Sequence, residues 1–156
     1  GVAPPPADSN PEQENKGDAK NLERARLKAE KDATKAEKEA IRAQKKEAAK
    51  AAKAAESCLA LAAKAVAGLG SLSTELAAVK VPKDTPESIA DPIKLAKSNI
   101  AHMVKASSAV ITASKRKDFA SNAPTLDFDH KQMSISVGEA RAAMKKLQDY
   151  VQLVGI

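Results

Sequence analysis

Apolar residues recur at steps of four and three in three separate segments of this 156-residue chain. A stripe with that spacing lies on one face of an α-helix, and such a face must be covered by other helices. Three stripes in one short chain therefore predict a bundle of three helices. The stripes are Leu59, Ala62, Val66, Leu69, Leu72, Leu76 and Val79; Ile89, Ile93, Ala96, Ile100, Met103, Ser107 and Val110; and Met133, Val137, Ala140, Met144, Leu147, Val151 and Val154.

The segment before the first stripe is almost entirely alanine, lysine, glutamate and arginine, without glycine or proline. These residues are the strongest helix formers, and opposite charges three residues apart, such as Asp32–Lys35 and Glu39–Arg42, add support. We predict one long helix from about 19 to 79. A break at Gly68–Gly70 is the alternative, because each glycine costs about 1 kcal/mol in a helix. Its small apolar stripe consists of Ala25, Ala29, Ala33, Ala36, Ala40 and Ala43, with Leu22, Leu27 and Ile41 as the large apolar neighbours.

Capping signals indicate where the second and third helices start. Thr85-Pro86 and Asp91-Pro92 each have the form of an N-cap followed by proline at the first helical position, and the sequence favours Asp91-Pro92. The third helix begins either after Asp129 or at the capping box Ser136-x-x-Glu139, and it ends near Val154.

Composition divides the chain into three parts. Residues 1–17 hold three consecutive prolines and no large apolar side chain, so they predict a disordered tail. Residues 18–54 form a charged, alanine-rich helical arm, and 55–156 form the bundle. The predicted fold is thus an all-α, elongated, antiparallel three-helix bundle with a long Ala/Lys/Glu-rich N-terminal helical extension. Aromatic residues make up only 2% of the chain, and we expect no deep pocket.

A net charge of +6 permits attraction to nucleic acid, an anionic membrane or an acidic protein. Acidic residues alternate with basic ones along the arm, which weakens its field, and no aromatic side chain is present there for base stacking. These features favour a solvated spacer or coiled-coil arm. No apolar run is expected to span a membrane, since Lys64 interrupts the best one. The predicted partner-binding residues are Arg24, Arg26, Lys28, Lys31, Lys35, Lys38, Arg42, Lys45 and Lys46.

Signals for catalysis are weak. The chain has no glycine-rich phosphate loop and no HExxH or GxSxG motif, so we predict neither an enzyme nor a cofactor. The one metal-like grouping is Asp127, Asp129 and His130, but aspartates before a helix usually act as caps, and no metal site is predicted. His102 is interpreted as a structural histidine, and Cys58 as a small packing residue.

One short run resembles a known family. The opening turns of vinculin-binding helices in talin-like rod bundles are similar to Leu59, Ala62, Ala63, Val66 and Ala67. The resemblance implies close packing of helices through small residues. Gly70 and Ser73 stand where that family has large aliphatic side chains, so no family is assigned.

Together these features predict a non-enzymatic structural or adaptor protein. It would dock within a larger assembly through its basic alanine-rich arm and its bundle surface, with a protein partner or by self-association through helices. The alternative is a basic nucleic-acid-binding or nucleoprotein-packaging protein, in which the arm contacts phosphates without base readout.

Overall fold

The computed structural model describes residues 11–155, with side chains from Gly17 onwards. Over these residues the chain forms three helices and no strand: α1 (Pro11–Ala78), α2 (Glu87–Ala113) and α3 (His130–Val154). The predicted all-α fold with a long N-terminal helix is confirmed. The chain divides into two compact units between Glu47 and Ala48.

Helix α1 passes without a break through Gly68 and Gly70. A Cβ atom added to either glycine would meet nothing within 4 Å, so neither residue marks a close helix crossing. The helix starts at Pro11, inside the segment that was predicted to be disordered, and proline suits a first helical position because its missing N–H needs no partner there. Residues 1–10 of that predicted tail lie outside the described residues.

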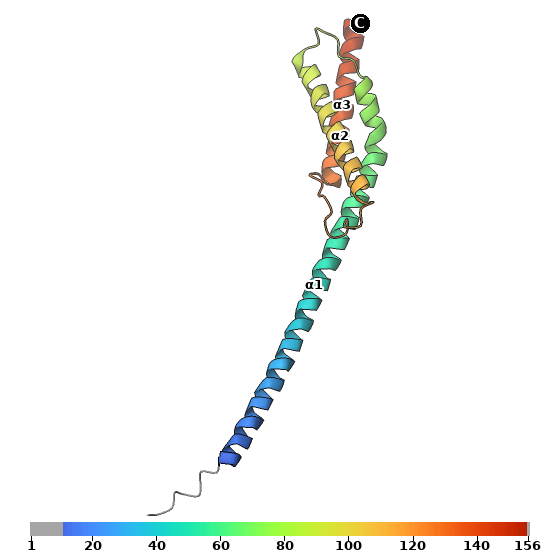
Figure 1. Ribbon diagram of the computed structural model, residues 1–156. Helices are drawn as coiled ribbons and strands as arrows, with labels where there is room; N and C mark the ends of the chain where they lie inside the picture. Colours follow the sequence, from blue (N-terminus) through green and yellow to red (C-terminus); the bar gives the residue numbers. More distant parts are fainter. Residues whose placement is uncertain (1–10, 156) are drawn as a thin grey trace, which may run out of the picture. The chain divides into compact units, whose positions relative to one another are not determined.

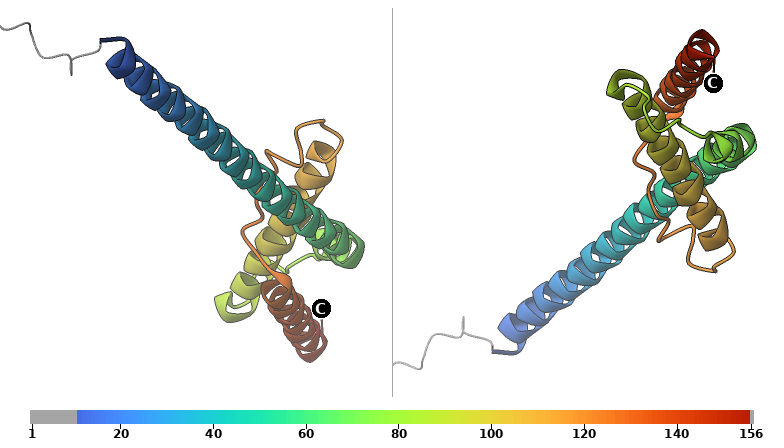
Figure 2. Two further views of the ribbon diagram at one scale, coloured as in Figure 1. Left: turned by 90° about the horizontal axis from the view of Figure 1, so that it is seen from below. Right: turned by 90° about the horizontal axis from the view of Figure 1, so that it is seen from above.

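In the unit from Ala48 onwards, the three helices are antiparallel (Figures 1 and 2). Helix α2 runs back along the C-terminal part of α1, and α3 reverses direction again. The main core joins small and aliphatic side chains of all three helices, including Leu69 and Leu72 of α1, Ile100 of α2 and Ala140 of α3. The buried residues of α1 are Ala55, Ala62, Ala65, Leu69, Leu72 and Leu76, whereas Leu59 and Val66 of the predicted stripe are only half-buried beside them.

A second cluster lies at the end of the bundle where α1 connects to α2. Ile93, Ala143 and Leu147 are its buried members, and half-buried side chains such as Val81 pack around them. Two long side chains fasten the connection to the helices. The Lys97 ammonium donates to the Val79 carbonyl at 2.8 Å, and the Tyr150 hydroxyl donates to the Asp84 carbonyl at 3.4 Å.

The preferred start of α2 at Asp91-Pro92 was wrong. The helix begins at Glu87, directly after Pro86, whose carbonyl accepts hydrogen bonds from the amides of Ile89 (3.0 Å) and Ala90 (2.9 Å). Pro92 lies inside the helix, where its missing N–H costs one backbone hydrogen bond. The extra turn lets Ile89 pack against the second cluster, which offsets part of that cost.

Helix α3 starts directly after Asp129, which is its N-cap, and not at Ser136. The Asp129 carboxylate accepts a hydrogen bond from the Gln132 amide at 2.8 Å, and the helix begins at His130. The competing Ser136-x-x-Glu139 box therefore lies within the helix. The C-terminus of α3 is capped by Gly155, whose left-handed backbone conformation (φ 70°) is readily adopted only by glycine.

The connection between α2 and α3 is held by its own anchors. Phe128 inserts into the main core and is only 6% exposed. Four residues earlier in this connection, the Pro124 carbonyl accepts a hydrogen bond from the Cys58 thiol at 3.1 Å. Cys58 is half-buried, as a packing residue would be.

Candidate functional site

The arm presents all of its described side chains to solvent. Every residue from Gly17 to Lys50 is exposed, including the large apolar residues Leu22, Leu27 and Ile41. Within this chain, therefore, the predicted binding residues bury nothing and are accessible to a partner.

Helix geometry sorts the charges of the arm onto separate faces. At about 100° per residue, eight of the nine predicted basic residues fall within an arc of about 100° that contains no acidic residue of segment 17–47. The acidic residues thus flank this face rather than interrupt it, and the predicted weakening of the field stays a prediction. Arg26 lies outside the arc. Lys20 lies inside it and was missed, although its four-residue spacing from the next basic position could have revealed it. This basic stripe comprises Lys20, Arg24, Lys28, Lys31, Lys35, Lys38, Arg42, Lys45 and Lys46.

A second face of the arm carries only small or apolar residues along its centre. Leu27 and Ile41, which were predicted to be neighbours of the alanine stripe, lie on nearly the opposite side of the helix. The alanine face and the basic stripe occupy different arcs of the helix. The alanine face comprises Leu22, Ala25, Ala29, Ala33, Ala36, Ala40 and Ala43.

The charge pairs predicted to support the arm do not form ion pairs within 4 Å. Among the side chains that the structure describes, the one ion pair within 4 Å joins His102 to Asp127. The arm's helix consequently depends on the intrinsic propensity of its residues, because exposed ion pairs add little in any case.

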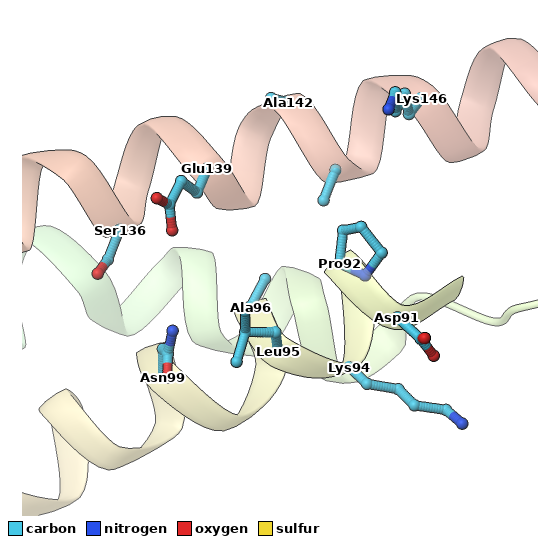
Figure 3. Close-up of a pocket in the computed structure, with 11 residues that line it drawn as sticks. Asp91, Pro92, Lys94, Leu95, Ala96, Asn99, Ser136, Glu139, Ala142 and Lys146 are labelled. Carbon is cyan, nitrogen blue, oxygen red and sulfur yellow. The ribbon is translucent and has the colours of Figure 1, made fainter. Parts of the chain in front are cut away.

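The bundle has an open hollow between α2 and α3 (Figure 3). Its volume is about 890 Å³. A second hollow of about 320 Å³ shares Asn99 and Ser136 with the first, so the two are adjacent; together they are called the α2–α3 groove. Measured along α2 from Asp91 to His102, the groove is about 17 Å long, or three helical turns.

The α2–α3 groove has a small-residue floor and two exposed aliphatic side chains. Ala96 (6% exposed) and Ala143 (4% exposed) form part of the floor. Leu95 and Ile135, which line the groove, are 59% and 49% exposed. In the described part of the bundle, the other large apolar residues with comparable exposure are Leu153 and Val154, at the end of α3. Among the described residues of the bundle, exposed large apolar side chains therefore lie in two places, this groove and the end of α3.

Charged residues along the groove are arranged by sign. Lys94 of α2 and Lys146 of α3 lie towards one end, accompanied by Asp91. Glu139 lies further along α3, and Asp127 lies at the far end. The groove is thus more basic at one end and more acidic at the other.

The predicted metal-like grouping is not assembled. Asp127 faces His102, whose Nε2 lies 3.0 and 2.8 Å from its two carboxylate oxygens, while Asp129 caps α3. Among the described residues, no three histidine, cysteine, aspartate or glutamate side chains come together as a metal site would require. The pair of Asp127 and His102 instead ties the α2–α3 connection to α2, which is a structural role for this histidine.

One stretch of α1 has the length and apolar composition needed to cross a membrane, contrary to the reading of Lys64 as an interruption. Its mean hydropathy is 1.3 over 18 residues. A core helix of a soluble bundle meets the same criterion, and α1 supplies Leu69, Leu72 and Leu76 to the core. The absence of a transmembrane segment stays a prediction.

Comparison with protein-family models, with curated proteins and with solved structures found no match. The surfaces just described are therefore the basis for a functional assignment.

Proposed function

We propose that this protein is a non-enzymatic structural or adaptor module that docks within a larger assembly through its arm, while the bundle surface provides a second contact. The observation that carries the proposal is the arm itself. From Gly17 to Lys50 a single helix keeps every side chain exposed and places basic and small apolar residues on separate faces.

The arm's composition supports docking to another macromolecule. An exposed alanine face lets a partner helix approach closely, because alanine side chains barely extend beyond the helix backbone. The basic stripe extends about 39 Å from Lys20 to Lys46 and attracts an acidic protein surface in register with it. A surface with this length and charge suits the binding of an extended partner.

The test begins with the full chain purified from its native source together with what binds to it. We expect a protein to be retained after nuclease treatment, and to be lost from the variant Lys31→Gln/Lys35→Gln/Lys38→Gln. The matched control, Lys115→Gln/Arg116→Gln/Lys117→Gln, removes the same charge from exposed positions outside the arm and should retain the partner. Isolation of a free chain, or equal retention by both variants, would contradict docking through the arm.

The basic stripe also favours a second candidate function, contact with nucleic-acid phosphates. A row of lysines and arginines without intervening acids gives affinity without base readout. In that case mixed-sequence duplex DNA or single-stranded RNA would bind the full chain, with an affinity that falls steeply as salt is added. Release of the co-purifying material by nuclease would favour this function over the adaptor.

A further inference from the structure

The α2–α3 groove is an unoccupied place for a further helix. Its floor includes the buried alanines Ala96 and Ala143, which would let an incoming helix approach closely. Leu95 and Ile135 are exposed beside this floor and would be covered by such a helix. The groove length of about three turns matches about eleven residues of helix.

The alanine face of the arm matches the groove in length and in the small size of its side chains. This face is exposed along its whole length, and the section from Ala29 to Ala40 has the same length of about 17 Å as the groove. Small residues on both surfaces would let the two helix backbones come close together. The arm's small residues are therefore suited to this site.

Charge order supports the same pairing. On each edge of the alanine face a basic residue precedes the acidic ones: Arg26 precedes Glu30 and Glu37 on one edge, and Lys28 precedes Asp32 and Glu39 on the other. Because both edges share this order, the match does not depend on which edge faces α2.

The groove carries the opposite order if the arm lies parallel to α3. With Ala29–Ala40 placed along the groove, Arg26 and Lys28 then approach Asp127, and Glu37 and Glu39 approach Lys94 and Lys146. Asp91 and Glu139 are the groove charges that do not fit this arrangement. The antiparallel orientation would bring like charges together on both edges, so the charges select one direction.

We propose that the α2–α3 groove binds the alanine face of the arm of a second copy of this chain. No glycine or proline lies between Gly17 and Gly68 at which a helix could readily reverse onto its own bundle. The inference deepens the proposed function, on which it rests, by naming the partner of the alanine face, and apart from Lys28 it leaves the basic stripe available to another molecule.

The first experiment measures the mass of the full chain by analytical ultracentrifugation over a range of concentrations. We expect self-association that is lost in the groove variant Leu95→Glu/Ile135→Glu. Leu153→Glu is the matched control, because Leu153 is 86% exposed and lies outside the groove. Circular dichroism would verify that each variant keeps its helices. A chain that remains monomeric at all concentrations would overturn the proposal.

The arm is tested with Ala33→Gln/Ala36→Gln, which adds bulk to the alanine face without changing charge. Ala49→Gln places the same change on the opposite, exposed side of the helix and should leave association intact. Equal association of these two variants would overturn the proposal.

Mixing the two defective variants gives the decisive result. Each retains one intact surface, so an equimolar mixture of the arm variant and the groove variant should associate although neither does so alone. Arm-to-arm pairing instead predicts that the groove variant still associates alone, and groove-to-groove pairing predicts the same of the arm variant. Docking within one chain predicts that the mixture does not associate. Each of these outcomes would overturn this inference, while retention of an acidic partner by the basic stripe would still support the proposed function.

Discussion

Replacing Ser107 by alanine should stabilise the bundle, although serine-to-alanine changes in a core often remove a useful hydrogen bond. Ser107 lies on the inner face of α2 and is 0% exposed. Its hydroxyl oxygen has no hydrogen-bond partner among the described residues. A buried hydroxyl without a partner lowers stability, because its hydrogen bonds to water are lost on folding and nothing replaces them.

The size of the effect follows from three terms. Leaving the hydroxyl unsatisfied costs about 1–3 kcal/mol. Removing one oxygen atom leaves a void of roughly 20 Å³, which costs about 0.5 kcal/mol at about 24 cal/mol per Å³. Alanine also exceeds serine in helix propensity by about 0.5 kcal/mol. The free energy of unfolding should therefore rise by about 1–3 kcal/mol in Ser107→Ala.

The neighbouring Ser108 provides a matched control, because it is exposed in the same helix. Ser108→Ala should show the propensity gain alone. Tyr150 is the only tyrosine and the chain has no tryptophan, so its fluorescence reports on the bundle during denaturant unfolding without a contribution from the arm. The reasoning is refuted if Ser107→Ala stabilises no more than Ser108→Ala. The hydroxyl would then be satisfied in solution, for example by the Met103 carbonyl one turn earlier.

Three further predictions concern the bundle, each checked by the same unfolding measurement. Phe128→Ala should lower stability by about 3–5 kcal/mol, because the side chain is buried in the main core; a loss below 1 kcal/mol would contradict its role as an anchor. Asp129→Ala should cost about 1 kcal/mol through loss of the cap on α3, whereas Asp129→Asn should retain most of it. Gly68→Ala and Gly138→Ala should each add about 1 kcal/mol, since open space awaits the new methyl group. Gly155→Ala should instead lower the free energy of unfolding, because φ is positive there. A rise in all three variants would refute the argument.

The helices were predictable because their signals are local. The spacing of Ile93, Ile100 and Met103 already defines a buried face, and those residues are buried as expected. The buried side of α1 was harder to predict, since alanine occurs on every side of that helix. Ala65 is buried while Val66 is only half-buried, because α2 and α3 decide which side of α1 is covered.

Helix starts required knowledge of the packing. Two Xaa-Pro pairs offered equivalent caps for α2, and the position of Ile89 against the second cluster accompanies the earlier start. For α3, Phe128 fixes the preceding chain in the core, so Asp129 is the residue placed to cap the helix. Local capping preferences alone differ by too little energy to decide between such alternatives.

The sequence by itself determined the fold class of the protein: a charged arm whose alanine face carries Leu22 as its one large apolar residue, joined to a bundle whose faces are marked by 4–3 spacing. It also contained the basic stripe, which needs only helical geometry to be recognised. The tertiary structure alone decided that Asp127 meets His102 and that α2 and α3 leave a groove lined by Leu95 and Ala96. Both features join residues far apart in the chain, and such contacts depend on how the helices pack rather than on the preferences of any one segment.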